Sequence, residues 1–105
     1  MKLRSVTRQD ALPLLDELRA MAVIKPGPNA KRLVRAKEIC FQLQGQEWAS
    51  PWMREKLDEV YRFLEILLSA RRWRDAPLSV DLMRSEIKGA CSRISKSLSP
   101  RARAV

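Results

Sequence analysis

The stretch from Ser50 to Trp73 constrains the fold more than any other, because it carries the longest sustained helical pattern in the chain. Its apolar residues recur at spacings of 4, 3, 4 and 3, which places them on one face of a helix: Met53, Leu57, Val60, Leu64 and Leu67. Tyr61, Phe63, Ile66 and Leu68 widen that face, so this helix is expected to pack against partners on more than one side.

Similar patterns predict three further helices, giving helices over about residues 11–24, 30–44, 51–73 and 80–97. The expected N-cap of the first is Asp10, because Pro13 then falls at the third helical position, where its missing N–H costs little. The other expected N-caps are Asn29, Ser50 and Ser79, with Gly45 closing the second helix.

The segments between these helices are short and marked by Pro, Gly and Ser, and residues 99–105 form a basic tail. Residues 1–6 alternate weakly, which suits a short strand or an extended arm. A chain of 105 residues is expected to form one domain. The sequence therefore predicts a single helical domain, residues 1–105, of the all-α class: a compact four-helix bundle.

Charge is the strongest compositional signal, with a formal net charge of +9 and a pI near 10.4. Arginine supplies 14 of the 21 basic residues, which fits either a GC-rich codon bias or selection for bidentate contacts with phosphate and carboxylate. Residues 25–46 carry a net charge of +4 and residues 71–105 a net charge of +6, whereas residues 47–70 carry −2. A balance this basic fits a nucleic acid, an anionic membrane surface or an acidic protein as partner.

The basic clusters supply the candidate nucleic-acid-binding residues: Arg71, Arg72, Trp73, Arg74, Arg84, Lys88, Lys31, Arg32 and Arg35. In the run from Arg71 to Arg74, the indole could stack on a base while the guanidiniums hold phosphates; alternatively, the arginines complement a helix dipole and the Trp covers the core. In the first turns of the second helix the cations face an unfavourable dipole, which favours an external role for them. Either cluster could also be an ordinary solvated face.

A second set of candidates is apolar and suits a protein partner: Trp48, Trp52 and Phe41. The two tryptophans bracket Ser50-Pro51, where they could clamp the entry of the helix or fill a groove on a partner. Gly89, inside the last helix on a strip with Ser85, Ser92 and Lys96, predicts close approach of another helix or of a phosphate backbone.

Several classes of chemistry are disfavoured. The chain has no histidine, no P-loop and no Rossmann fingerprint, so we expect neither an enzyme nor a metal or other cofactor. Cys40 and Cys91 are expected to be buried thiols in a reducing compartment, and no segment predicts a signal peptide or a membrane span.

The expected function is that of a cytoplasmic accessory protein that binds DNA or RNA through phosphate contacts. The alternative is a protein-binding adaptor or inhibitor that acts through its apolar and tryptophan surfaces, either as a homodimer or docked on an acidic protein.

Overall fold

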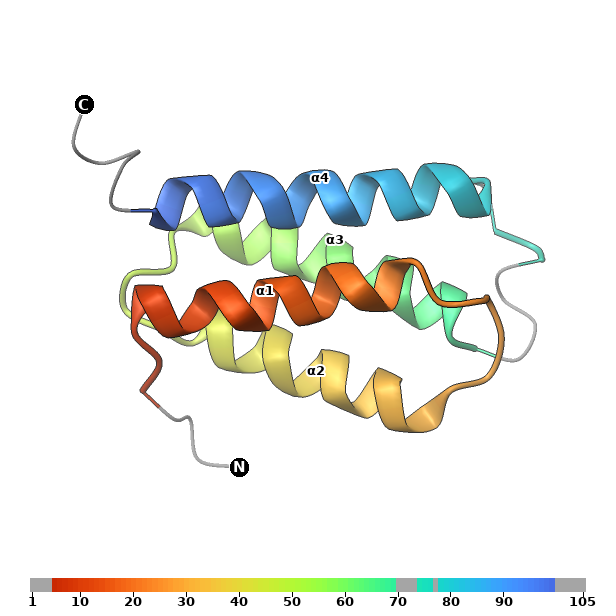
Figure 1. Cartoon of the computed structure of the whole chain (residues 1–105), viewed down its shortest axis with the longest axis horizontal. Coiled ribbons are helices and arrows are strands. Elements are labelled where there is room, and N and C mark those ends of the chain that lie inside the picture. The colour runs from red at the N-terminus through yellow and green to blue at the C-terminus, as the bar shows by residue number, and fades with distance from the viewer. Residues whose placement is uncertain (1–4, 70–73, 77, 100–105) are drawn as a thin grey trace.

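The computed structural model describes residues 5–69, 74–76 and 78–99, and these form an all-helical bundle (Figure 1). Its helices are α1 (Arg8–Ala22), α2 (Ala30–Gln44), α3 (Pro51–Leu67) and α4 (Val80–Leu98). Successive helices run in opposite directions, so the end of α1, the start of α2, the end of α3 and the start of α4 meet at one end of the bundle. The predicted four-helix bundle is confirmed.

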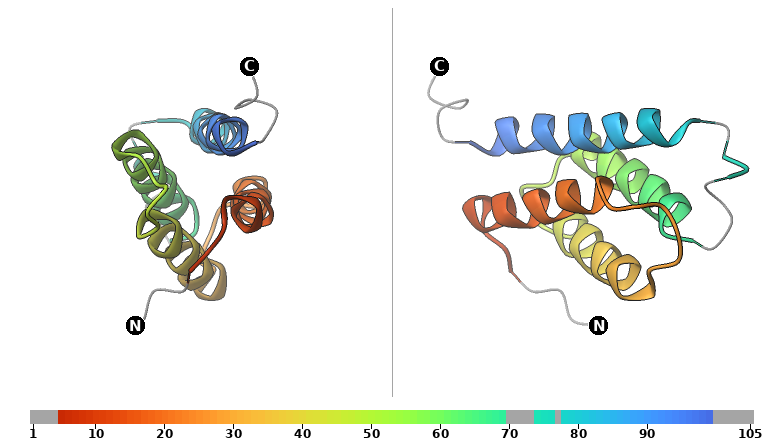
Figure 2. Two further views of the ribbon diagram at one scale, coloured as in Figure 1. Left: turned by 90° about the vertical axis from the view of Figure 1, so that its left-hand side faces the viewer. Right: turned by 45° about the vertical axis from the view of Figure 1, so that its right-hand side comes forward.

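The core is a single apolar cluster to which all four helices contribute. The five residues of the α3 stripe are all buried, as their spacing predicted. Because its apolar face is wide, α3 packs against both α2 and α4, while α1 packs mainly against α4 (Figure 2). The predicted N-caps Asn29, Ser50 and Ser79 each accept a backbone N–H in the first turn of their helices.

The start of α1 differs from the prediction. Thr7, not Asp10, is the N-cap, and its hydroxyl accepts the N–H of Asp10 at 3.0 Å. The helix therefore begins at Arg8 and contains Pro13, although that proline leaves one helical hydrogen bond unmade. Tertiary contacts outweigh this cost, because Gln46 and Trp48 hold the backbone of Val6, directly before the cap, at 3.0 and 2.8 Å.

The end of α3 also differs. The helix was expected to run to residue 73, but it ends at Leu67, with Leu68 as its C-cap. The α1–α2 connection crosses this end and satisfies its carbonyls: the N–H of Gly27 donates to Leu67 O at 2.9 Å and that of Asn29 to Leu68 O at 3.0 Å. A continuing helix would have used those carbonyls itself.

Gly89 has no closely approaching helix among the described residues, so the first of the two predicted reasons for this glycine is wrong. A Cβ atom built at this position meets only the flexible end of Arg93, at 3.4 Å. Gly27 differs, because its φ of +146° lies in a region that side-chain-bearing residues rarely adopt, although the space around it is open.

The two glycines therefore make a matched pair of substitutions. Gly89→Ala should raise the free energy of unfolding by about 0.5–1 kcal/mol, since it restricts the unfolded chain and fits the helix. Gly27→Ala should lower it by roughly 1–3 kcal/mol through backbone strain. Urea titrations of the two variants measure both changes, and a loss of stability in Gly89→Ala would mean that the position needs its glycine.

Both cysteines are free and buried, as predicted. Burial raises the pKa of Cys40 to about 12, with the nearby Cys91 and Asp58 adding to the effect. Burial likewise raises the pKa of Cys91 to about 11. The folded protein thus keeps both thiols protonated at a pH where an unfolded chain begins to lose their protons.

Alkaline pH should therefore destabilise the fold. The contribution of the thiols is fully present below the ordinary thiol pKa of 9.0 and is lost as the pH rises toward about 11 for Cys91 and about 12 for Cys40. Each thiol lowers the free energy of unfolding by up to about 1.4 kcal/mol per pH unit across that window. Urea titrations from pH 8 upward should show a shallower decline for Cys40→Ala than for the natural sequence. Equal slopes would show that other groups govern the alkaline transition.

Candidate nucleic-acid interface

The alternating helices bring the predicted cations to one end of the bundle. Lys31, Arg32 and Arg35 lie in the first turns of α2, while Arg84 and Lys88 lie in the first half of α4. Arg74 precedes α4, and all of these segments meet at the end described above (Figure 1). Arg71, Arg72 and Trp73 lie outside the described residues. The starts of α2 and α4 thus lie at the same end of the bundle, although these two helices do not pack against each other.

Lys31 and Arg32 are the cations best placed for an external anion. Both are exposed, and neither side chain forms an ion pair with a described residue. The first turn of α2 holds no acidic residue, so the positive charges lie unneutralised at the positive end of the helix dipole. Exposed Lys25, in the α1–α2 connection, adds a third such charge that the sequence pattern did not single out.

Arg35, in contrast, is committed to the fold. Its guanidinium holds Glu17 of α1 by both carboxylate oxygens, Nε to Oε1 at 2.7 Å and Nη2 to Oε2 at 3.0 Å. Glu38 lies on the same guanidinium at 3.5 Å. The hydrogen bond from Arg35 holds the pKa of Glu17 below its ordinary value, and the same bond raises the pKa of Arg35. This two-pronged ion pair ties α2 to α1.

Arg84 is also a structural residue. Its Nε donates to Ala22 O at 2.8 Å and its Nη2 to Ile24 O at 2.9 Å. The cation therefore satisfies carbonyls at the end of α1, where positive charge also complements the helix dipole. Lys88, one turn further along α4, is exposed and forms no ion pair with a described residue.

The apolar candidates likewise divide into a residue that the fold uses and residues that remain exposed. Trp48 packs against the core, and its indole N–H donates to Val6 O, so it holds the segment before α1. Trp52 and Phe41 are 40% and 47% exposed. Val34, two helical turns before Phe41 on α2, is 58% exposed. Phe41 and Val34 thus mark an apolar strip on the outside of α2.

Other chemistries find no support in the described part of the chain. No group of three or more histidine, cysteine or acidic side chains is placed to hold a metal ion there. Among the same residues, no helix combines the length and apolar character needed to cross a membrane.

The distinction between Arg84 and Lys88 can be measured. Arg84→Met should lower the free energy of unfolding by about 1.5–3 kcal/mol, because it removes two charge-assisted hydrogen bonds to helix-end carbonyls. Lys88→Met, which also removes one charge from α4, should change it by less than about 0.5 kcal/mol. Thermal and urea unfolding of the two variants provide the comparison, and equal losses would contradict the capping role.

Comparison with known proteins gives no relative for this chain: no family model, no curated protein and no solved structure matches it.

Proposed function

We propose that this protein is a small accessory protein that binds DNA or RNA mainly through phosphate contacts, with little dependence on base sequence. The observation that carries this proposal is a set of exposed cations without ion-pair partners among the described residues, three of them at or before the start of α2. Lys25, Lys31 and Arg32 come from the α1–α2 region and Lys88 from α4, more than fifty residues later. The two free thiols support a reducing, cytoplasmic location.

The charge around this end favours an anionic partner. Residues 16–36, which span the second half of α1, the connection and the first turns of α2, contain five basic and two acidic residues. Residues 38–59, which lead around the opposite end of the bundle, contain two basic and five acidic residues. A polyanion would be attracted more strongly to the first region than to the second.

The test is a titration of labelled single- and double-stranded oligonucleotides, followed by fluorescence anisotropy at several salt concentrations. Binding should weaken steeply with salt, and Lys31→Glu combined with Arg32→Glu should lower affinity by at least about tenfold at low salt. The plot of log affinity against log salt should also become flatter, by about 0.7–0.9 for each phosphate that the variant no longer neutralises. Acidic residues suit the start of a helix, so the fold should be retained.

The control is a second double variant, Lys37→Glu with Arg93→Glu. These residues are also exposed and outside any described ion pair, so the change in net charge is the same. A smaller loss of affinity in this control would locate the interface at the end of the bundle where α2 and α4 begin, the cation-bearing end. Absence of binding by the natural sequence at about 50 mM salt, where phosphate contacts are strong, would refute the proposal.

The exposed strip of Val34 and Phe41 favours a second candidate, a protein-binding adaptor or a homodimer. Aromatic side chains contribute strongly to protein interfaces, and Phe41 lacks the burial its size would favour. A dimeric mass by light scattering that becomes monomeric with Phe41→Ser, together with no affinity for oligonucleotides, would establish this candidate in place of the first.

A further inference from the structure

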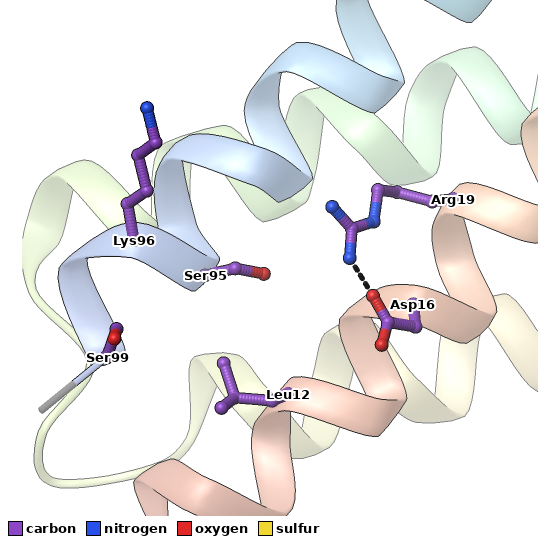
Figure 3. Close-up of a pocket in the computed structure, with 6 residues that line it drawn as sticks. All are labelled: Leu12, Asp16, Arg19, Ser95, Lys96 and Ser99. Carbon is purple, nitrogen blue, oxygen red and sulfur yellow. Dashed lines mark ion pairs between the residues drawn. The ribbon is translucent and has the colours of Figure 1, made fainter. Parts of the chain in front are cut away.

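A groove between α1 and α4 gathers polar and charged side chains away from the cluster described above (Figure 3). It is open to solvent and has a volume of about 350 Å³. The residues that line it are Leu12, Asp16 and Arg19 of α1 and Ser95, Lys96 and Ser99 of α4.

Ser95 is the residue that points to a ligand. Its Oγ atom is buried yet has no hydrogen-bond partner within the described chain. Figure 3 shows this hydroxyl directed from α4 across the groove toward Asp16 and Arg19. A buried hydroxyl normally bonds to protein or to an ordered molecule, so this position is prepared for a group that the groove can admit.

The charged residues of the groove determine what that group is. Arg19 forms an ion pair with Asp16 and donates to Ser92 Oγ at 3.2 Å, which holds its guanidinium at the groove. Lys96 lies on the rim, exposed and outside any described ion pair. In Figure 3 its ammonium group points away from Arg19, and its flexible side chain can rotate toward the opening. Two cations and one carboxylate leave a net charge of +1, which suits a ligand with one negative charge.

We propose that this groove binds one phosphodiester group of a nucleic-acid backbone. A phosphodiester carries a single negative charge and two unesterified oxygens, which Lys96, Arg19 and the Ser95 hydroxyl can share. Doubly charged inorganic phosphate is less suitable, because Asp16 would repel its second charge. The inference rests on the proposed function and extends it by adding a defined contact.

The groove also continues the interface along α4. Lys88, Ser92 and Ser95 recur at spacings of 4 and 3, so they lie on one strip of the helix, and Ser99 follows as its C-cap. Lys88 and Lys96 are eight residues apart, a rise of about 12 Å along the helix, so a strand that contacts both must span several phosphates. A single strand could therefore contact Lys88 near the cation-bearing end and Lys96 at the groove.

The experiment measures the affinity of the full chain for a single-stranded oligonucleotide of roughly ten nucleotides, within the usual range of such sites. Lys96→Gln should weaken binding several-fold more than Arg93→Gln, which removes the same charge elsewhere on α4. Ser95→Ala should weaken binding without lowering the free energy of unfolding. Ser85→Ala, at an exposed position, should change neither the affinity nor the free energy of unfolding. Asp16→Asn should strengthen binding, a gain that a purely structural role for Asp16 would not produce.

Amide NMR spectra, recorded with the oligonucleotide and separately with inorganic phosphate, locate the contact. The proposal is supported if the amide signals of Ser95, Lys96 and Ser99 shift at lower concentrations of the oligonucleotide than of inorganic phosphate. If the oligonucleotide binds but these amides do not shift, or if Lys96→Gln matches Arg93→Gln, the groove contact is refuted while the proposed function stands. If the oligonucleotide does not bind at all and only inorganic phosphate shifts these amides, both the phosphodiester contact and the proposed function are refuted.

Discussion

Capping of helix ends by groups from remote parts of the chain is the interaction on which the cation-bearing end depends. The last carbonyls of a helix have no partners within the helix, so each end that packs against protein must obtain donors from elsewhere. Arg84 of α4 supplies them to the end of α1, and the backbone of Gly27 and Asn29 supplies them to the end of α3. These bonds fix the connection that carries Lys25 and the start of α2 against the rest of the bundle.

This capping also explains how much of the fold could be predicted. The helical stripes and three of the four N-caps depend on residues within a few positions of one another, so the sequence pattern was sufficient to place them. The end of α3 was misplaced because its stop signal comes from Gly27 and Asn29, some forty residues earlier. The start of α1 was misplaced for the same reason, since Gln46 and Trp48 outweigh the local preference of Pro13.

The candidate site, too, could be predicted only in part from the sequence. Composition predicted a basic surface, but only the structure separates cations used by the fold from those left to solvent. Arginines are prominent in the first group: Arg19, Arg35, Arg54, Arg62 and Arg84 all bond within the chain. Several lysines belong to the second, and Lys25, Lys31, Lys88 and Lys96 form no ion pair with a described residue. The planar, multi-donor guanidinium thus serves mainly to join helices, whereas the ammonium groups provide charge that a partner can use.

The attachment of Val6 has a consequence for the order in which the chain folds. Its N–H and C=O bond to the side chains of Gln46 and Trp48, which lie 40 and 42 residues later. Contacts of such separation gain free energy only after the intervening chain has closed into a loop. The first turn of α1, whose cap follows Val6 directly, should therefore become ordered only once the α2–α3 corner has formed. Nucleation of this bundle is accordingly expected in its later helices, with the N-terminal turn added last.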